Sequence, residues 1–321
     1  MEGFTKVRCD EPMSARPLIF TIFGQPGIGK TSLAFTMPKP VLFMDFDRGI
    51  TRAVQENRPD SYHVSDFGQF YQYVQSPEFE KEVRDGEYKT FAVDTVGAML
   101  DDFAATYLVR SDRKNGNASG GLSLQGWGAL GVLFNALRNR FTELGLNVVF
   151  IAHSKDAGED AVARMDLAIK GGSSDIVVRV SDQIGFVYVE GQYRVIDFAP
   201  SQMHLGKDTG AIGKVHIPHS TSAEYPTFLA DIVTKCNDKM FSDSSAVLEA
   251  KAKTTAFKAE IERLTEPEDF EAFAGVLAEQ PTTIKAVLRP LFMARMGAAG
   301  VAYDKANKAY YFVESDEAHN Q

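Results

Sequence analysis

The sequence predicts an α/β protein with a mostly parallel, twisted sheet flanked by helices, and three observations support this. Short apolar runs rich in β-branched residues alternate along the chain with segments of helical spacing. A glycine-rich turn joins the first apolar run to the first helical segment. Several of the apolar runs end in a polar side chain. Alternating strands and helices are typical of a parallel sheet with helices on its faces.

The glycine-rich turn at residues 24–31 reads GQPGIGKT and fits the phosphate-binding pattern GxxxxGK[ST] at every fixed position. It follows the apolar run 17–23, which is the predicted first strand. In such a loop, backbone N–H groups and the following helix N-terminus surround phosphate oxygens. Lys30 is expected to reach the β- and γ-phosphates of ATP, and the Thr31 hydroxyl to bind Mg²⁺. The predicted nucleotide-binding residues are Gly24, Gln25, Pro26, Gly27, Ile28, Gly29, Lys30, Thr31 and Ser32.

Three later apolar runs end in residues that suit this chemistry. Residues 41–47 end in Asp45 and Asp47, residues 88–95 contain Asp94, and residues 147–153 end in His153. Ligands of open parallel sheets bind outside the carboxyl ends of the strands, so we expect these side chains to converge on the nucleotide. Asp94 is expected to be the carboxylate that anchors Mg²⁺.

The remaining pattern predicts further helices, a hairpin and loops. A helix with an apolar face from Leu130 to Leu144 is expected to end at a left-handed Gly145. The polar stretches 110–121 and 154–175 are predicted to be loops, the first of them mobile. The other expected elements are helices at 66–84 and 96–109, a hairpin over 184–198, a turn at 206–210 and a strand at 215–218.

The chain divides into three regions by composition. Residues 1–16 form a polar, irregular lead-in, and residues 17–243 carry the strands and motifs. Residues 244–321 are rich in Ala, Glu, Lys and Leu and predict a small helical appendage, in which Thr265 caps a helix and Glu268 closes a capping box.

The overall composition restricts the function and the compartment. A net charge of −9 argues against a protein that coats nucleic acid through bulk positive charge, although a local basic patch remains compatible with it. Cys9 and Cys236 indicate neither a disulfide framework nor a cysteine metal site, which suits a reducing cytoplasm. Neither a membrane span nor a signal peptide is indicated, so we expect a cytoplasmic protein that does not bind membranes.

The order of these elements resembles the RecA-like recombinase ATPases. The similarity covers residues 17–220 and is closest to phage-encoded ATP-binding proteins built on a minimal RecA core. It implies that Lys30, Asp47, Asp94 and His153 are the catalytic residues, with Asp47 as the base that activates water and His153 as the γ-phosphate sensor. Asp47 stands where the family usually has Glu, so Asp45 remains an alternative base, and His153 stands where the bacterial recombinase has Gln.

The resemblance also implies partners. The expected activity is ATP hydrolysis coupled to single-stranded DNA in phage-type recombination or strand annealing, by a homo-oligomer that forms a ring or filament. Other phage recombination or replication proteins would be partners in the bacterial host cytoplasm. Lys207 would act as a finger on a neighbouring subunit's nucleotide, or is a solvated turn lysine. The expected DNA contacts lie in the two polar stretches, at Arg110, Arg113, Lys114, Lys155, Arg164 and Lys170.

Two other functions remain open. One is a replication or helicase-loading ATPase that acts on a protein partner. The other is a small-molecule kinase, although no arginine-rich lid is apparent in the sequence.

Overall fold

The computed structural model of the chain describes residues 15–53, 58–157 and 164–313. The predicted lead-in, including Cys9, and the C-terminal residues 314–321 therefore lie almost entirely outside the described residues. The described chain forms two compact units, and the boundary between them in the sequence falls between Met240 and Phe241. In the described parts, every helix is too short or too polar to cross a membrane.

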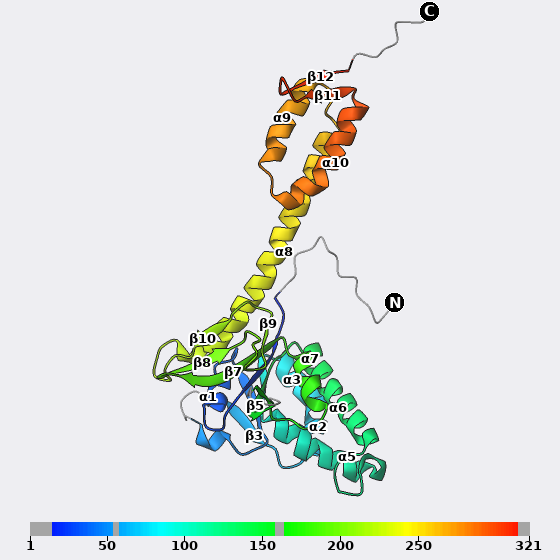
Figure 1. The fold of residues 1–321 in the computed structure, drawn as a ribbon. Coiled ribbons are helices and arrows are strands. Elements are labelled where there is room, and N and C mark those ends of the chain that lie inside the picture. Colours follow the sequence, from blue (N-terminus) through cyan, green and yellow to red (C-terminus); the bar gives the residue numbers. More distant parts are fainter. Residues whose placement is uncertain (1–14, 54–57, 158–163, 314–321) are drawn as a thin grey trace, which may run out of the picture. The chain divides into compact units, whose positions relative to one another are not determined.

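The first unit confirms the predicted fold class. Among the described residues, ten strands form one mixed sheet in the order β10-β8-β7-β1-β5-β4-β2-β3, with β6 beside β5 and β9 beside β7 (Figure 1). The pairs that connect β7, β1, β5, β4, β2 and β3 are all parallel. The strands are β1 (Ile19–Gly24), β2 (Val41–Asp45), β3 (Asp60–His63), β4 (Thr90–Asp94), β5 (Asn147–Asp156), β6 (Met165–Leu167), β7 (Gln183–Glu190), β8 (Tyr193–Asp197), β9 (Lys207–Asp208) and β10 (Lys214–His216).

Side chains on alternate strand positions build one hydrophobic core on each face of the sheet. In β1, Phe20 and Ile22 belong to one core, while Phe23 belongs to the other. Helix α6 covers the Phe23 face with the apolar side predicted for it. The helices of this unit are α1 (Lys30–Ala34), α2 (Phe67–Gln75), α3 (Pro77–Arg84), α4 (Val96–Ala98), the π-helical turn Met99–Ala104, α5 (Ala105–Ser111), α6 (Leu124–Glu143), α7 (Ser173–Val180) and the start of α8 (Phe228–Ile261).

The strand register aligns the polar strand ends. Gly24 at the end of β1 is paired with His153 of β5, and Asp45 at the end of β2 is paired with Asp94 of β4. Because these strands are parallel, the four positions lie at one edge of the sheet. This edge carries the turn that enters α1, and it is where the candidate site lies.

The stretch 110–121 is not the free loop that its polar composition predicts. Helix α5 continues through Ser111, and a 3₁₀ turn follows at Arg113–Asn115. Asn115 is buried and donates a hydrogen bond to the Leu108 carbonyl, and the Asn117 side chain accepts from two backbone N–H groups farther along the turn. In these bonds the asparagine side chains pair with backbone groups that would otherwise bind water, so the segment has a defined conformation.

Other local predictions need correction. The predicted helix at 66–84 is two helices, because Ser76 caps α3 and Pro77 occupies its first position. The stretch 154–175 contains the end of β5, strand β6 and the start of α7 rather than a continuous loop, with 158–163 outside the described residues. In the predicted turn at 206–210, Lys207 and Asp208 pair with β7 as β9. Gly145 has the predicted left-handed conformation, with φ of 72°.

The second unit has its own hydrophobic core. Buried side chains of the end of α8, α9 (Pro267–Ala278) and α10 (Thr282–Ala298) form it, with Phe270 and Leu288 fully covered. The unit is not purely helical as predicted, because β11 (Val301–Asp304) and β12 (Ala309–Phe312) pair in an antiparallel hairpin. The cap of α9 is Glu266 rather than Thr265, and its backbone N–H donates to the Asp269 side chain.

Candidate nucleotide-binding site

The phosphate loop connects the buried end of β1 to the first turn of α1. Gly24 has no room for a side chain, because a Cβ there would collide with the carbonyl of Val187 on β7. Gly27 and Gly29 have positive φ angles of 79° and 93°, which favour glycine. The sequence pattern therefore corresponds to a tight turn whose backbone faces an open space at the sheet edge.

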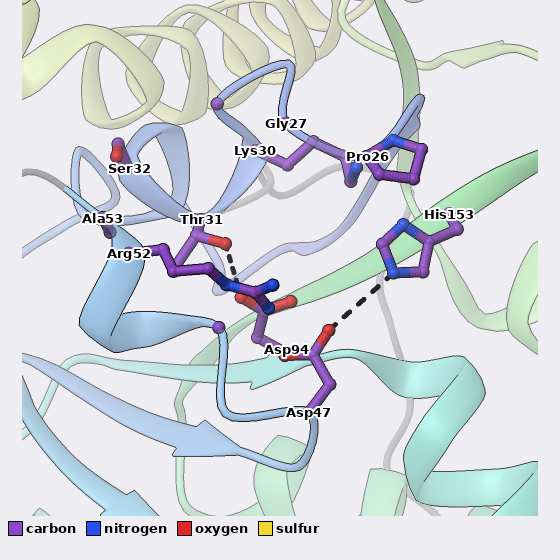
Figure 2. A pocket seen from close by; sticks show the side chains of 12 residues that line it. Pro26, Gly27, Lys30, Thr31, Ser32, Asp47, Arg52, Ala53, Asp94 and His153 are labelled. Carbon is purple, nitrogen blue, oxygen red and sulfur yellow. Dashed lines mark hydrogen bonds and ion pairs between the residues drawn. The ribbon is translucent and has the colours of Figure 1, made fainter.

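That space is a cavity of about 330 Å³ at the carboxyl edge of the sheet (Figure 2). Five of the predicted loop residues line it, together with the three polar strand-end residues predicted to act there. Gly24, Gln25 and Ile28 complete the loop but do not line the cavity. The lining residues are Pro26, Gly27, Gly29, Lys30, Thr31, Ser32, Asp47, Gly49, Arg52, Ala53, Asp94 and His153.

Lys30 lies at the cavity floor with its ammonium group held by the loop itself. Its Nζ donates to the carbonyls of Gly24, at 2.9 Å, and Gln25, at 2.8 Å. Burial lowers the pKa of Lys30 to about 8, against the attraction of nearby Asp94 and Asp47. A positive charge in this partly desolvated position interacts strongly with an anion that enters the cavity.

Thr31 and Asp94 form a pair of oxygen ligands beside Lys30. Thr31 Oγ1 donates a hydrogen bond of 2.6 Å to Asp94 Oδ2, as Figure 2 shows. Burial raises the pKa of Asp94 to about 7, and the neighbouring Asp47 and Asp45 carboxylates add to the effect. A cation bound here would offset the cost of holding this carboxylate ionised away from water.

Asp47 and His153 face each other across the cavity. His153 Nε2 lies 3.7 Å from Asp47 Oδ2 (Figure 2). Asp47 belongs to the turn that follows β2, and His153 lies within β5. The imidazole of His153 holds the pKa of Asp47 below its ordinary value. Asp47 is therefore a carboxylate at neutral pH, in a position to accept hydrogen bonds from a water molecule in the cavity.

Asp45 has a different environment. It is buried, and its two carboxylate oxygens accept from the backbone N–H groups of Gly49, at 2.9 Å, and Ile50, at 3.4 Å. These bonds fix the turn that brings Asp47 into the cavity, and Asp45 itself does not line that cavity. The geometry thus favours Asp47 over Asp45 as the group that meets a substrate.

Arg52 is a lining residue that sequence reasoning missed. It ends the 3₁₀ turn Ile50–Arg52, and its positive charge contributes to the low pKa of Asp47. It lines the same cavity as Thr31 and Asp94. Arg52 lies five residues after Asp47 and belongs to no recognised motif. The sequence offered one indication of its role, which is a cationic residue in the turn after a strand that ends in carboxylates.

The residues present fit a nucleoside triphosphate with Mg²⁺. Mg²⁺ is bound by oxygen, commonly through one or two protein ligands with phosphates and water completing the shell. Thr31 and Asp94 supply such a pair, and the loop backbone with Lys30 supplies donors for phosphate. The His153 Nδ1 atom is buried and has no hydrogen-bond partner among the described residues, so it can pair with a bound group.

Comparison with known families agrees with this geometry. A family model described as an AAA domain matches residues 16–209, more than half of the chain. The chain belongs to the AAA domain family. It is therefore a P-loop nucleotide-binding protein of the ATPase class, and the match includes the phosphate loop and the strand ends that line the cavity. Comparison with curated proteins gave no match.

The predicted DNA-contacting residues of the AAA domain lie outside the nucleotide cavity. Arg110 is in the last turn of α5, and Arg113 and Lys114 are exposed in the 3₁₀ turn that follows. They form one basic group on consecutive elements. Lys155, Arg164 and Lys170 are also exposed but belong to a second segment near β6.

Some of the predicted cations contact the AAA domain itself. Lys155 Nζ donates to the Ile169 carbonyl, whereas in Lys170 the backbone N–H, and not the ammonium group, donates to the Asp101 carboxylate. Lys207 is half-buried in β9, and its Nζ lies 3.4 Å from the carbonyls of Val178 and Arg179 at the end of α7. In this arrangement Lys207 therefore contacts its own subunit.

Proposed function

We propose that this AAA domain protein hydrolyses ATP to ADP and phosphate and that single-stranded DNA stimulates the reaction. The observation that carries the proposal is the cavity in which a phosphate loop, a Thr31–Asp94 oxygen pair and the Asp47 carboxylate meet at one sheet edge. A protein that only binds nucleotide needs the phosphate loop and the oxygen pair. Hydrolysis also requires a group that activates water, and the Asp47 carboxylate can serve as that group.

The chain's own groups divide the chemistry among them. The loop N–H groups and Lys30 hold the phosphates and neutralise charge that develops on the transferred group. Thr31 and Asp94 would hold Mg²⁺, which would supply positive charge for the phosphates. Asp47 orients the attacking water and accepts its proton, and His153 beside it senses the γ-phosphate through its second ring nitrogen. Arg52 adds a second positive charge at the open side of the cavity.

The basic group of Arg110, Arg113 and Lys114 supports DNA as the regulating ligand. Arg110 ends α5, and Arg113 and Lys114 are exposed in the turn that follows, so the three cations are close enough in sequence to contact neighbouring phosphates of a strand. The acidic net charge of −9 makes such a local cluster stand out against the rest of the surface. The resemblance to RecA-like phage recombination proteins supports a role in recombination or strand annealing, carried out by a homo-oligomer in the bacterial cytoplasm.

The test measures phosphate release from ATP with and without single-stranded DNA. We expect a Mg²⁺-dependent basal rate and a several-fold increase when the DNA is added. A size measurement with an ATP analogue and an oligonucleotide should show an assembly larger than one chain. Hydrolysis with no response to DNA would contradict the recombination role and favour an ATPase that acts on a protein partner.

A further inference from the structure

A second cavity of the same unit includes Arg110 of the basic group in its lining. It has a volume of about 310 Å³ and lies between the loop that enters α2 and the outward face of the π-helical turn and α5. We refer to it as the aromatic pocket. Its principal lining side chains are Asp66, Phe67, Asp102, Phe103, Tyr107 and Arg110.

The helical wall of the aromatic pocket follows from its spacing. Phe103, Tyr107 and Arg110 recur at steps of four and three residues, which places them on one face of a helix. Phe103 belongs to the π-helical turn Met99–Ala104, a distortion that often accompanies functional sites. The wall therefore presents two rings followed by a guanidinium.

The rings are held in place from behind. Phe103 packs edge-on against Phe46, with centroids 5.3 Å apart, and Tyr107 packs against Phe67 at 5.5 Å. Tyr107 nevertheless keeps 37% of its surface exposed. Gly68 lies against the Tyr107 ring, where an added Cβ would be 3.2 Å both from the ring and from Asp66 Oδ1. The absence of a side chain at Gly68 keeps the pocket open beside this ring.

We propose that the aromatic pocket binds an unstacked base of single-stranded DNA. This inference rests on the proposed function, because it names where that DNA is held. A base offers an aromatic face for Tyr107 and an adjoining phosphate for Arg110, and stacking with nearby cations is how single strands are commonly bound. Arg110 belongs both to this pocket and to the basic group, so the two features form one continuous surface.

The carboxylates of the pocket predict which bases bind best. Asp66 and Asp102 accept hydrogen bonds, and adenine, cytosine and guanine carry exocyclic amino donors. Thymine offers only its N3–H, which is flanked by two carbonyl oxygens that repel a carboxylate. We therefore expect strands of adenine or cytosine to bind more tightly than thymine strands of equal length. A purely electrostatic surface would bind all of them alike at the same salt concentration.

The experiment titrates the full-length protein with fluorescent oligonucleotides of adenine, cytosine or thymine and measures anisotropy. Tyr107→Ala should weaken the binding of adenine strands by about tenfold or more, since a stacked base contributes that much. It should leave the salt dependence unchanged, because no charge is removed. Gly68→Leu should crowd the Tyr107 ring and have a similar effect. Tyr62→Ala, which removes an exposed ring outside the pocket, is the matched control.

The outcomes separate the pocket from the proposed function. If the intact protein binds no oligonucleotide, the DNA role itself is wrong. If it binds all strands equally and both pocket variants bind like the intact protein, the DNA role stands and the pocket inference is overturned. Fluorescence of 2-aminopurine within the strand gives a second readout, because stacking on Tyr107 should quench it in the intact protein and less in Tyr107→Ala.

Discussion

Thr31 Oγ1 and Asp94 Oδ2 are joined by a hydrogen bond of 2.6 Å between the first turn of α1 and the end of β4. The Thr31 hydroxyl, which follows the loop lysine, thus donates to a carboxylate whose pKa burial raises to about 7. A bound cation can take the place of this hydrogen bond and interact with the Asp94 carboxylate directly. The first prediction follows from this relationship.

Asp94→Asn should increase stability at alkaline pH in the absence of Mg²⁺. An unfolded aspartate has a pKa of about 3.9, so between about pH 4 and pH 7 the folded chain holds a proton that the unfolded chain has lost. The free energy of unfolding therefore falls as pH rises through this window. The amide removes this cost. A pKa difference of about three units corresponds to about 4 kcal/mol, so we expect a gain of up to about 4 kcal/mol near pH 8 and a gain of less than half that size near pH 5.

Thermal unfolding at the two pH values, without Mg²⁺ or nucleotide, measures this effect. Asp47→Asn is the matched control, because the pKa of Asp47 is lowered and its carboxylate stabilises the folded state above about pH 4. It should lose stability where Asp94→Asn gains it. A less stable Asp94→Asn protein near pH 8 would show that the ionised carboxylate is favoured at this position.

Lys30→Ala should nearly abolish ATP turnover while the protein remains folded. Loss of one group that stabilises transition-state charge typically lowers the rate by about 10²–10³-fold. Steady-state phosphate release and circular dichroism measure the two properties, and Lys81→Ala on α3 removes an exposed lysine as the control. Turnover close to that of the intact protein would mean that the loop does not hold the transferred phosphate.

Asp47→Asn should separate nucleotide binding from hydrolysis. The amide keeps the shape but cannot accept a proton, and removal of a general base typically costs about 10²–10⁴-fold in rate. Asp45→Asn should instead lower the melting temperature, because its amide group would face two backbone N–H donors. ATP affinity and turnover of both variants provide the comparison, and the reverse pattern would make Asp45 the base.

Substituting Arg110, Arg113 and Lys114 together by alanine should weaken the salt dependence of DNA binding. Each phosphate neutralised on a single strand contributes about −0.7 to the slope of log affinity against log salt, so the slope should flatten by roughly two units. Alanine at Lys81, Arg84 and Lys89 removes the same charge from another surface and serves as the control. An unchanged slope in the first triple variant would exclude this cluster as the DNA contact.

A chain that ends before Ser245 should still fold as a nucleotide-binding unit. The part of α8 that packs on the sheet, including Leu229 and Val233, precedes this point, and the core of the second unit begins at Ile261. A shorter chain that ends before Phe228 removes those buried residues and should be insoluble. Solubility and ATP binding test both truncations, and an inactive longer form would mean that the second unit completes the first.

Sequence reasoning succeeded where a local pattern decides the structure. The parallel strands could be recognised from buried apolar runs, and their polar ends meet because the register aligns Gly24 with His153 and Asp45 with Asp94. Strand β3 was missed because all four of its residues are exposed, which leaves no apolar run to recognise. The loop after α5 was misjudged because the side-chain bonds of Asn115 and Asn117 that fix it join residues close in the sequence and follow no apolar period that a pattern could reveal.

Arg52 and the aromatic pocket were missed because both depend on the folded arrangement of the chain. Arg52 lines the cavity because a short 3₁₀ turn, held by Asp45, carries it back over the sheet edge. The aromatic pocket combines residues about forty positions apart and arises only when the α2 entry loop meets the π-helical turn. Neither relationship is visible as a spacing along the chain.

The register of the strands limits where residues can be inserted into or deleted from this protein. Because successive side chains of a strand point to opposite faces, inserting or deleting one residue within β4 would turn Asp94 away from Thr31. The same holds for His153 in β5. Length variation among relatives of this chain should therefore accumulate in the connections, while the interiors of β1, β4 and β5 keep a fixed residue count.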